Sequence, residues 1–317
     1  MQLMKISTHN EWDSLRTIVV GSATDANWPT KGTFRNQEET TLWRETPVPS
    51  GPADPQVIKE SQEDLDNFCN VLEQRGVKVL RPDHINFQEI DGMYNYCPRD
   101  RLLVVGDTVV DCNMLYAERE IENTAYPWIF ENAGRVLTVP RDQGIFFDAA
   151  NVSRLNNTLL YLESVSGNLA GAHWLQEQFP DYTVEVTNSY TGVHIDATVV
   201  PVREGLVVLN KDKITPENLP KVFKDWDIIW LGKEHMPDKQ FLNYPYASVY
   251  IQLNFLMLDP NTALIDSNVP ALTEALAKYD VESINIPLRH SRTLGGGHHC
   301  VTLDLHRENE TNSSSTA

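Results

Sequence analysis

A cysteine beside two histidines is the feature of this sequence most able to do chemistry. Residues 294–305 read LGGGHHCVTLDL, so Cys300 lies where a triple-glycine loop meets an alternating apolar stretch. Such glycines often form only a tight turn, and a buried cysteine often serves as a small hydrophobic side chain. Zinc is a second alternative, but adjacent strand residues point to opposite faces, so His299 and Cys300 are not expected to reach one ion. Because the chain also lacks CxxC and HExxH motifs, we predict no metal site.

Composition limits the classes of function. The chain has 317 residues with 26 Lys and Arg against 44 Asp and Glu, a formal charge of −18. Nucleic acids and anionic membranes both reward clustered positive charge, so neither is an expected partner. The first ten residues lack the apolar core of a signal peptide, and the apolar runs are too short to span a bilayer. Four cysteines do not form a disulfide framework in a chain this long, so we expect a cytoplasmic protein.

A strand, helix, strand pattern recurs five times along the chain. The expected helices are 54–75, 118–132, 169–179, one that opens at 215–218, and 269–279. The strands that follow them begin near Val77, Arg135, Tyr182, Asp227 and Val281. This spacing indicates radial or linear repetition, and the helices between strands argue against an all-β propeller. We expect one domain over residues 1–306 and a disordered polar tail over 307–317.

Unusual side chains follow each of these later strands. The five stretches are 95–100 (NYCPRD), 146–151 (FFDAAN), 192–198 (GVHIDAT), 246–250 (YASVY) and the GGGHHC loop. If the five units surround an axis, one cysteine, one histidine and three aspartates line a single pocket. Clustered aspartates repel one another unless a cation lies among them, and a guanidinium suits them because carboxylates bind it through paired hydrogen bonds. A thiolate and a histidine add a nucleophile and a proton carrier.

Five motifs of the sequence resemble those of a known family. FDAANVSRL, VHIDATVVPVREGLVVLN, NFLMLD and LGGGHHCVTLDLHR are similar to motifs of the arginine:glycine amidinotransferases and their bacterial relatives in guanidino natural-product biosynthesis, and CPRDRLLVVGDTVVD resembles another. The resemblance extends over roughly residues 15–307 and keeps the order of the motifs. It implies an α/β fold of the pentein type, a five-bladed pseudo-symmetric propeller of ββαβ repeats around a central active site.

The resemblance also implies roles for five side chains. Cys300 would be the nucleophile, His194 the general acid and base, and Asp148 the residue that orients it. Asp100 and Asp196 would hold the guanidinium. Each has an ordinary alternative when taken alone: a core histidine, turn residues, or two strand neighbours that share a face.

Two further positions are implied with departures from the family pattern. Ser248 falls where the family has a serine near the amino-acid end of the substrate. Lys213 occupies the position of an arginine that binds the donor carboxylate in the vertebrate enzyme, and it keeps the charge without the bidentate fork. The stretch between Val139 and Asp148 is short where other members have a long insertion, so the acceptor end of the pocket is expected to differ. His298, His299, Cys69 and Cys112 are expected to be structural.

The implied activity is ping-pong amidino transfer. Cys300 takes the amidino group of L-arginine, L-ornithine leaves, and a primary amine then accepts the group without a metal or an organic cofactor. Two alternatives remain: an arginine deiminase or dihydrolase that uses water instead of the amine, and a non-catalytic guanidine-binding protein. The sequence does not choose among glycine, lysine, an aminocyclitol or a polyketide-bound amine as the acceptor. The family also implies a possible homodimer.

Overall fold

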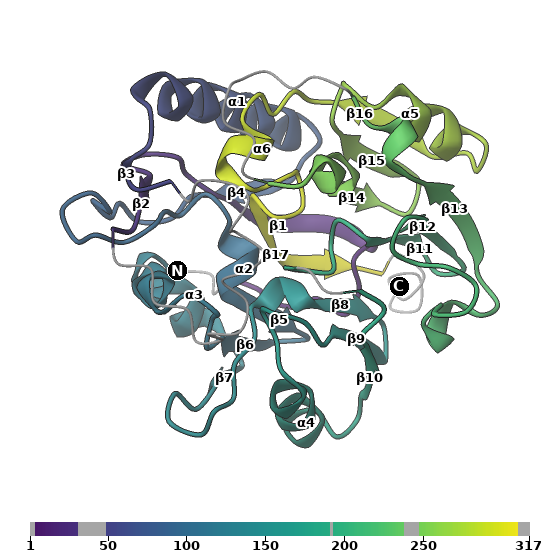
Figure 1. Ribbon diagram of the computed structural model, residues 1–317, viewed down its shortest axis with the longest axis horizontal. Coiled ribbons are helices and arrows are strands. Elements are labelled where there is room, and N and C mark those ends of the chain that lie inside the picture. The colour runs from purple at the N-terminus through teal and green to yellow at the C-terminus, as the bar shows by residue number, and fades with distance from the viewer. Residues whose placement is uncertain (1–3, 31–48, 191–192, 238–246, 310–317) are drawn as a thin grey trace, which may run out of the picture.

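Five three-stranded sheets surround a common centre (Figure 1). The computed structural model describes residues 4–30, 49–190, 193–237 and 247–309. In every sheet the first two strands are antiparallel and the third is parallel to the second. The five-bladed α/β propeller of repeated units is therefore confirmed.

The strands of each blade run outward from the centre in a fixed order. In Figure 1 the first strands, β17, β5, β8, β11 and β14, lie nearest the centre. The first blade contains β17 (Thr302–Glu308), β1 (Ser14–Val20) and β4 (Lys78–Leu80). The second contains β5 (Leu102–Val105), β6 (Thr108–Asp111) and β7 (Arg135–Thr138). The third blade contains β8 (Val152–Leu155), β9 (Thr158–Leu162) and β10 (Thr183–Thr187). The fourth contains β11 (Val199–Arg203), β12 (Leu206–Asn210) and β13 (Asp227–Leu231). The last contains β14 (Leu256–Asp259), β15 (Thr262–Ile265) and β16 (Glu282–Asn285). A short pair outside the blades joins β2 (Asn27–Trp28) to β3 (Gly51–Pro52).

Helices connect the second strand of a blade to its third strand. They are α1 (Pro55–Gln74), η2 (Ala117–Ala125) with α3 (Pro127–Asn132), α4 (Leu169–Gln178), η4 (Lys221–Phe223) and α5 (Pro270–Ala277). The sequence signals of α1 act as expected: the Asp54 carboxylate accepts from Gln56 N at 2.7 Å, and Gly76 follows the helix with a φ of 79°. Its apolar face buries Leu65 and Phe68 completely.

Two of the expected helices are different in the structure. The segment predicted at 118–132 is a 3₁₀-helix followed by a short α-helix, because Pro127 has no N–H with which to continue the first one. The helix predicted to open at 215–218 does not form. Instead the Asn218 side chain accepts from Thr215 N at 2.6 Å, and Pro220 precedes a single 3₁₀ turn.

The last strand closes the ring by pairing with the first one in the sequence, β17 with β1. Disorder was expected from Arg307 onward, but this prediction was wrong at its start. The strand continues to Glu308, and the buried Arg307 donates from Nε to Oδ2 of Asp304 at 2.7 Å. The rest of the predicted tail, 310–317, lies outside the described residues, and a single domain over 1–306 stays a prediction.

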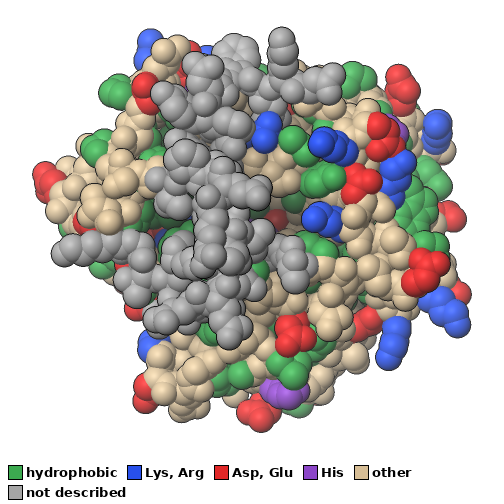
Figure 2. Space-filling view, in the orientation of Figure 1, with side chains coloured by type: hydrophobic (Ala, Val, Ile, Leu, Met, Phe, Trp, Pro, Cys, Tyr) green, Lys and Arg blue, Asp and Glu red, His purple; other side chains and the backbone are tan. Residues whose placement is uncertain are grey.

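The described surface carries charges of both signs. Figure 2 shows Lys and Arg side chains interspersed with Asp and Glu on the right-hand part of one face. Across the described ranges, no helix is both long enough and apolar enough to cross a bilayer. Four further short helices help to place the central loops: α2 (Pro98–Arg101), η3 (Ala149–Asn151), η6 (Val249–Leu253) and α6 (Ser291–Leu294).

Candidate active site

The chemistry-bearing side chains lie immediately before the first strand of each blade. Asp100, Asn254 and Cys300 each precede that strand by two residues. Asp196 precedes its strand by three residues and Asp148 by four. Because the first strands lie nearest the centre, five loops far apart in the sequence meet there. The fifth of these positions was expected within 246–250; residue 246 lies outside the described ranges, and Asn254 occupies the equivalent place.

Cys300 lies buried at the meeting point of these loops. Its thiol donates to Oδ2 of Asp196 at 3.2 Å. Asn254 holds it from two sides: Nδ2 donates to Sγ at 3.2 Å, and Oδ1 accepts from Cys300 N at 2.9 Å. Sequence reasoning missed Asn254, although its offset from the strand matches those of Asp100 and Cys300.

The triple glycine lets two loops approach closely around the cysteine. Gly295 ends α6 in the left-handed region, at a φ of 79°. A Cβ on Gly297 would lie 2.6 Å from the main-chain oxygen of Asn254, and one on Gly296 would lie 2.5 Å from Sγ of Cys97. Both distances are shorter than carbon contacts allow, so a side chain here would push Asn254 away from Cys300.

The turn formed by these residues corrects one expectation. His299 and Cys300 were expected on a strand with opposite orientations, but both precede β17. Nδ1 of His299 lies 2.8 Å from Oδ2 of Asp196, the same oxygen that accepts from the thiol. Two adjacent residues therefore reach one carboxylate atom. His298 instead faces away, toward the main-chain oxygen of Ile286 at 3.0 Å, as expected of a structural residue.

His194 lies close to the cysteine, with a ring nitrogen within 4.8 Å of Sγ. Its Nε2 is 3.0 Å from Oδ2 of Asp148, whose Oδ1 accepts from Leu115 N at 2.8 Å. Its Nδ1 is 3.6 Å from Oδ1 of Asp100, too long for a hydrogen bond. The residue has a φ of 48°, in the left-handed region that residues with a side chain seldom adopt, and Tyr190 OH donates to its carbonyl at 2.5 Å. The ring thus has one nitrogen held and one nitrogen facing the site.

Asp100 is paired with a residue that the sequence did not indicate. Nη1 of Arg119 donates to Oδ2 of Asp100 at 2.9 Å, and Arg119 also binds Glu122. All these groups are buried. Oδ1 of Asp100 accepts no hydrogen bond from the described residues, so one buried anionic oxygen remains directed at the site.

The electrostatics of the free site favour a cationic ligand. Burial, and then the charges of Asp196 and Asp100, raise the pKa of Cys300 well above its usual range. Burial lowers the pKa of His194, but Asp100 and Asp148 outweigh this effect and raise it to about 9. Burial raises the pKa of Asp196, yet His299 and His194 bring it down to about 2. At neutral pH the site therefore holds a thiol, an imidazolium and an ionised Asp196.

A small cation is the other ligand that these donors could hold. One ligand atom from each of Asp100, His194 and Cys300 lies within 4.8 Å of the others. The same three atoms would also surround a planar cationic carbon, and Asp148 and Arg119 already engage two of the three residues. The absence of a metal requirement remains a prediction.

Ser248 and Lys213 lie farther from this centre. Ser248 is exposed and caps η6, where its hydroxyl accepts from Tyr250 N at 3.3 Å. The Lys213 ammonium lies 5.9 Å from the centre of the Tyr190 ring, and Tyr190 in turn contacts His194. Within the described ranges neither side chain touches Cys300, so their roles in substrate binding remain predictions.

Three named proteins are similar to the whole chain in sequence, although no family model matches it. An inosamine-phosphate amidinotransferase 1 from Streptomyces griseus is 36% identical, covering 95% of this chain and 97% of that protein. A mitochondrial glycine amidinotransferase from Xenopus tropicalis is 29% identical over 97% of this chain and 84% of its own length. An L-arginine:L-lysine amidinotransferase from Pseudomonas savastanoi pv. phaseolicola is 28% identical over 97% and 96%.

Solved structures agree with these similarities. The inosamine-phosphate amidinotransferase StrB1 from Streptomyces griseus superposes with a TM-score of 0.89 at 35% identity, covering 96% of this chain and 97% of that one. A DDAH from Pseudomonas aeruginosa, in a mutant complexed with citrulline, superposes with a TM-score of 0.65 at 15% identity over 92% and 99%. The second likeness is one of fold alone.

Proposed function

The chain belongs to the amidinotransferase family, and on that premise we propose that it moves the amidino group of L-arginine through a covalent intermediate on Cys300 to a primary amine. L-Ornithine is the first product. The observation that carries the proposal is the meeting of one thiol, one imidazolium and three buried carboxylates at the propeller centre. Such a centre suits a planar cation with an electrophilic carbon.

Binding of the donor prepares the nucleophile. The guanidinium would lie between Asp196 and Oδ1 of Asp100, which accepts no hydrogen bond from the described residues. Both carboxylates raise the thiol pKa in the free protein, so a cation between them offsets that effect and favours the thiolate. Deprotonation of Cys300, with loss of the thiol proton to solvent, is thereby coupled to the arrival of a positively charged substrate. Asn254 supports the thiolate with the hydrogen bond from Nδ2.

In the first half-reaction, the thiolate of Cys300 attacks the guanidinium carbon. The bond from that carbon to the ornithine nitrogen breaks, and His194 gives its Nδ1 proton to the departing amine. Because the pKa of His194 is about 9, the ring carries this proton at neutral pH. Ornithine leaves, and a cationic amidino group stays on sulfur.

The second half-reaction reverses these roles. The neutral His194 ring takes a proton from the incoming ammonium, and the free amine attacks the amidino carbon. The carbon–sulfur bond breaks, the second proton of the attacking nitrogen passes to sulfur, and Cys300 leaves as a thiol beside Asn254. The acceptor becomes a guanidine, and His194 ends protonated as it began. The pocket's carboxylates stabilise the cation in both halves, without a metal or organic cofactor in the proposal.

The acceptor and the binding of the amino-acid end belong to the same proposal. Relatives are named for inosamine phosphate, glycine and L-lysine, and these three amines form the panel to test. Lys213 would attract the donor carboxylate from beside Tyr190, and Ser248 would lie at the outer end of the substrate. We also propose that the protein is cytoplasmic, which the four unpaired cysteines support, and that it forms a homodimer, as the family resemblance implies.

Product analysis tests the proposal against its nearest alternative. The protein is incubated with L-arginine labelled in its guanidino carbon, with and without each amine of the panel. We expect the label in a new guanidine, with one ornithine formed for each. Labelled citrulline with ammonia would assign the chain to water as the second nucleophile. No product with any amine, while the protein still binds arginine, would support the non-catalytic alternative.

A further inference from the structure

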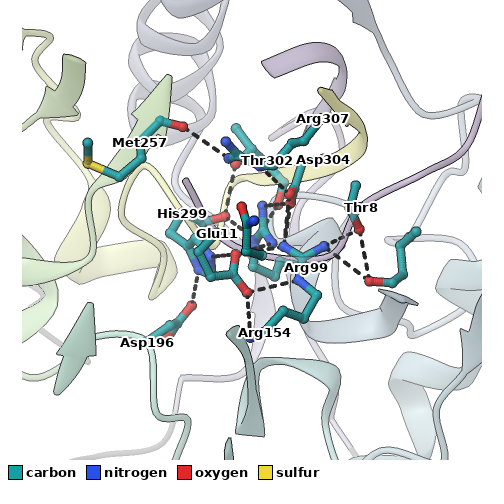
Figure 3. A network of polar contacts seen from close by, with 12 residues as sticks. Thr8, Glu11, Arg99, Arg154, Asp196, Met257, His299, Thr302, Asp304 and Arg307 are labelled. Carbon is teal, nitrogen blue, oxygen red and sulfur yellow. Dashed lines mark hydrogen bonds and ion pairs between the residues drawn. The ribbon is translucent and has the colours of Figure 1, made fainter. Parts of the chain in front are cut away.

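His299 connects the nucleophile to the ion pairs beneath the site (Figure 3). Its Nδ1 lies 2.8 Å from Oδ2 of Asp196, and its Nε2 lies 3.2 Å from Oε2 of Glu11. Carboxylates in this setting only accept hydrogen bonds, so both contacts are made when both ring nitrogens carry a proton. The ring and the two acids are buried. Neither nitrogen is left for the substrate, in contrast to Nδ1 of His194.

The main chain of His299 is fixed as firmly as its ring. Its carbonyl accepts from Nε of Arg99 at 2.9 Å and from Oγ1 of Thr302 at 3.0 Å. Its N–H donates to the carbonyl of Asn254 at 3.3 Å. The residue therefore has little freedom to turn away from Asp196 or to follow the substrate.

Glu11 anchors the far end of the ring. Arg154 binds Glu11 through Nε at 2.9 Å and Nη2 at 2.6 Å, and its Nη2 also lies 2.8 Å from Oδ2 of Asp304. Arg99 joins the same cluster, 3.6 Å from Glu11. Glu11 comes from the N-terminal segment, Arg154 from β8 and Asp304 from β17, so three parts of the chain hold one acid in place.

We propose that His299 is a positioning residue that holds the Asp196 carboxylate against Cys300 and offsets its charge there. Asp196 lies in a turn, three residues before β11. Apart from His299, the described side chain that hydrogen-bonds to its carboxylate is the thiol of Cys300. Without the Nδ1 donor, nothing in the described ranges fixes its Oδ2 on the side away from Cys300. His194 and Asp100 act on Asp196 only through charge.

The charged groups around this pair define the expected pH effect. Asp196 faces His299, His194, Asp100 and Cys300, and His299 also faces Glu11. The remaining groups near them are Arg99 and Arg154 on the Glu11 side, and Cys97 beside Cys300. Removal of the His299 donor leaves the Asp196 charge less balanced, which favours the neutral thiol.

Two substitutions separate the two ends of the ring. The amide nitrogen of asparagine matches Nδ1 of histidine, so His299→Asn keeps a donor to Asp196. The glutamine amide matches Nε2, so His299→Gln keeps the donor to Glu11 and loses the one to Asp196. His298→Gln is the control, since this buried neighbour contacts Ile286 and the Phe68 ring instead of Asp196.

The pH dependence of Cys300 alkylation by iodoacetamide, followed by peptide mass spectrometry, tests the proposal without any catalytic turnover. We expect the midpoint to rise by about one pH unit in His299→Gln and by less than half of that in His299→Asn. In His298→Gln it should stay at the original value even where thermal stability falls. Equal shifts in both His299 variants, no shift in either, or the same shift in His298→Gln would overturn the proposal.

A kinetic readout, which rests on the proposed function, sharpens the result. Fewer thiolates at a fixed pH should lower kcat about tenfold in His299→Gln, with partial recovery in His299→Asn. If the original protein transfers no amidino group, the proposed function fails while the alkylation experiment still decides the role of His299.

Discussion

Two histidines flank Cys300, and each lies next to two carboxylates, yet their surroundings differ. His194 has Nε2 fixed by Asp148, whereas its Nδ1 is 3.6 Å from Asp100 and faces the site. His299 has both nitrogens within hydrogen-bond distance of acids, Asp196 and Glu11. One ring can exchange a proton with a substrate, and the other cannot do so without breaking a buried contact.

The difference shows that the same arrangement, a histidine next to two carboxylates, can serve two purposes. The carboxylates of His194 are themselves held locally, by Leu115 N and by Arg119. Those of His299 lead into a cluster of buried arginines. A proton carrier needs one free nitrogen, while a positioning residue needs none.

The largest expected effect comes from removing the proton carrier. His194→Gln should lower amidino transfer about 10²- to 10⁴-fold, because neither the departing nor the incoming amine can then exchange a proton. Stopped-assay product analysis measures this loss beside His299→Gln, for which about tenfold is expected. Equal losses in the two variants would remove the distinction between the rings.

The pH dependence of stability gives the next largest effect. The pKa of His194 is raised to about 9, so its contribution is fully present below pH 6.5 and is lost as the pH rises toward 9. It amounts to about 3 kcal/mol of unfolding free energy at most. Urea titrations of the protein and of His194→Gln at pH 6 and pH 9.5 should show the difference between them shrinking.

The contribution of Asp196 to stability should be lost at the acid end of the pH range, opposite to that of His194. The pKa of Asp196 is lowered to about 2, so its contribution is present above pH 3.8 and is lost as the pH falls through 2. His194→Gln should leave this acid-side loss in place. Urea titrations of both proteins measure this loss, and an unchanged stability between pH 3.8 and pH 2 would contradict the charge assigned to Asp196.

Asn254 offers a sharper probe of the nucleophile itself. Asn254→Asp keeps the shape of the side chain but places an anion where Nδ2 donates to Sγ at 3.2 Å. We expect transfer to fall about 10- to 100-fold and Cys300 to alkylate only at higher pH, since the new charge opposes the thiolate. Unchanged alkylation would mean that Asn254 serves only to hold Cys300 N.

The smallest expected effect concerns the outer end of the pocket. Lys213→Met should raise the KM for L-arginine by about tenfold or less with kcat nearly unchanged, because a single half-buried charge that solvent still screens contributes modestly to binding. Lys211→Met is a matched control, as this exposed lysine pairs with Glu234. Equal effects of the two substitutions would remove Lys213 from the binding site.

Much of the fold could be predicted because it is local and repeated. Each blade has its own amphipathic helix or β-rich run, and the recurrence of these patterns along the sequence indicates five units. Cys300, Asp100 and Asp196 could be grouped because equivalent loops of a propeller must meet. The helix predicted to open at 215–218 does not form, because a local hydrogen bond from Thr215 N to the Asn218 side chain competes with helix formation.

The partners within the site were not predictable in the same way. Arg119 reaches Asp100 from a 3₁₀-helix whose side-chain directions the sequence does not reveal. Glu11 reaches His299 across 288 positions of the chain. Asn254 could be identified by its position two residues before β14, but this requires the exact start of that strand, which the sequence does not define.

Intact-protein mass spectrometry after mixing with L-arginine, without an amine acceptor, tests the central claim most directly. We predict a mass increase of one amidino group on the protein, one equivalent of ornithine, and no increase in Cys300→Ala. Addition of a competent amine should then restore the original mass. An unmodified protein that still converts arginine, or an adduct that persists in Cys300→Ala, would contradict covalent transfer through this cysteine.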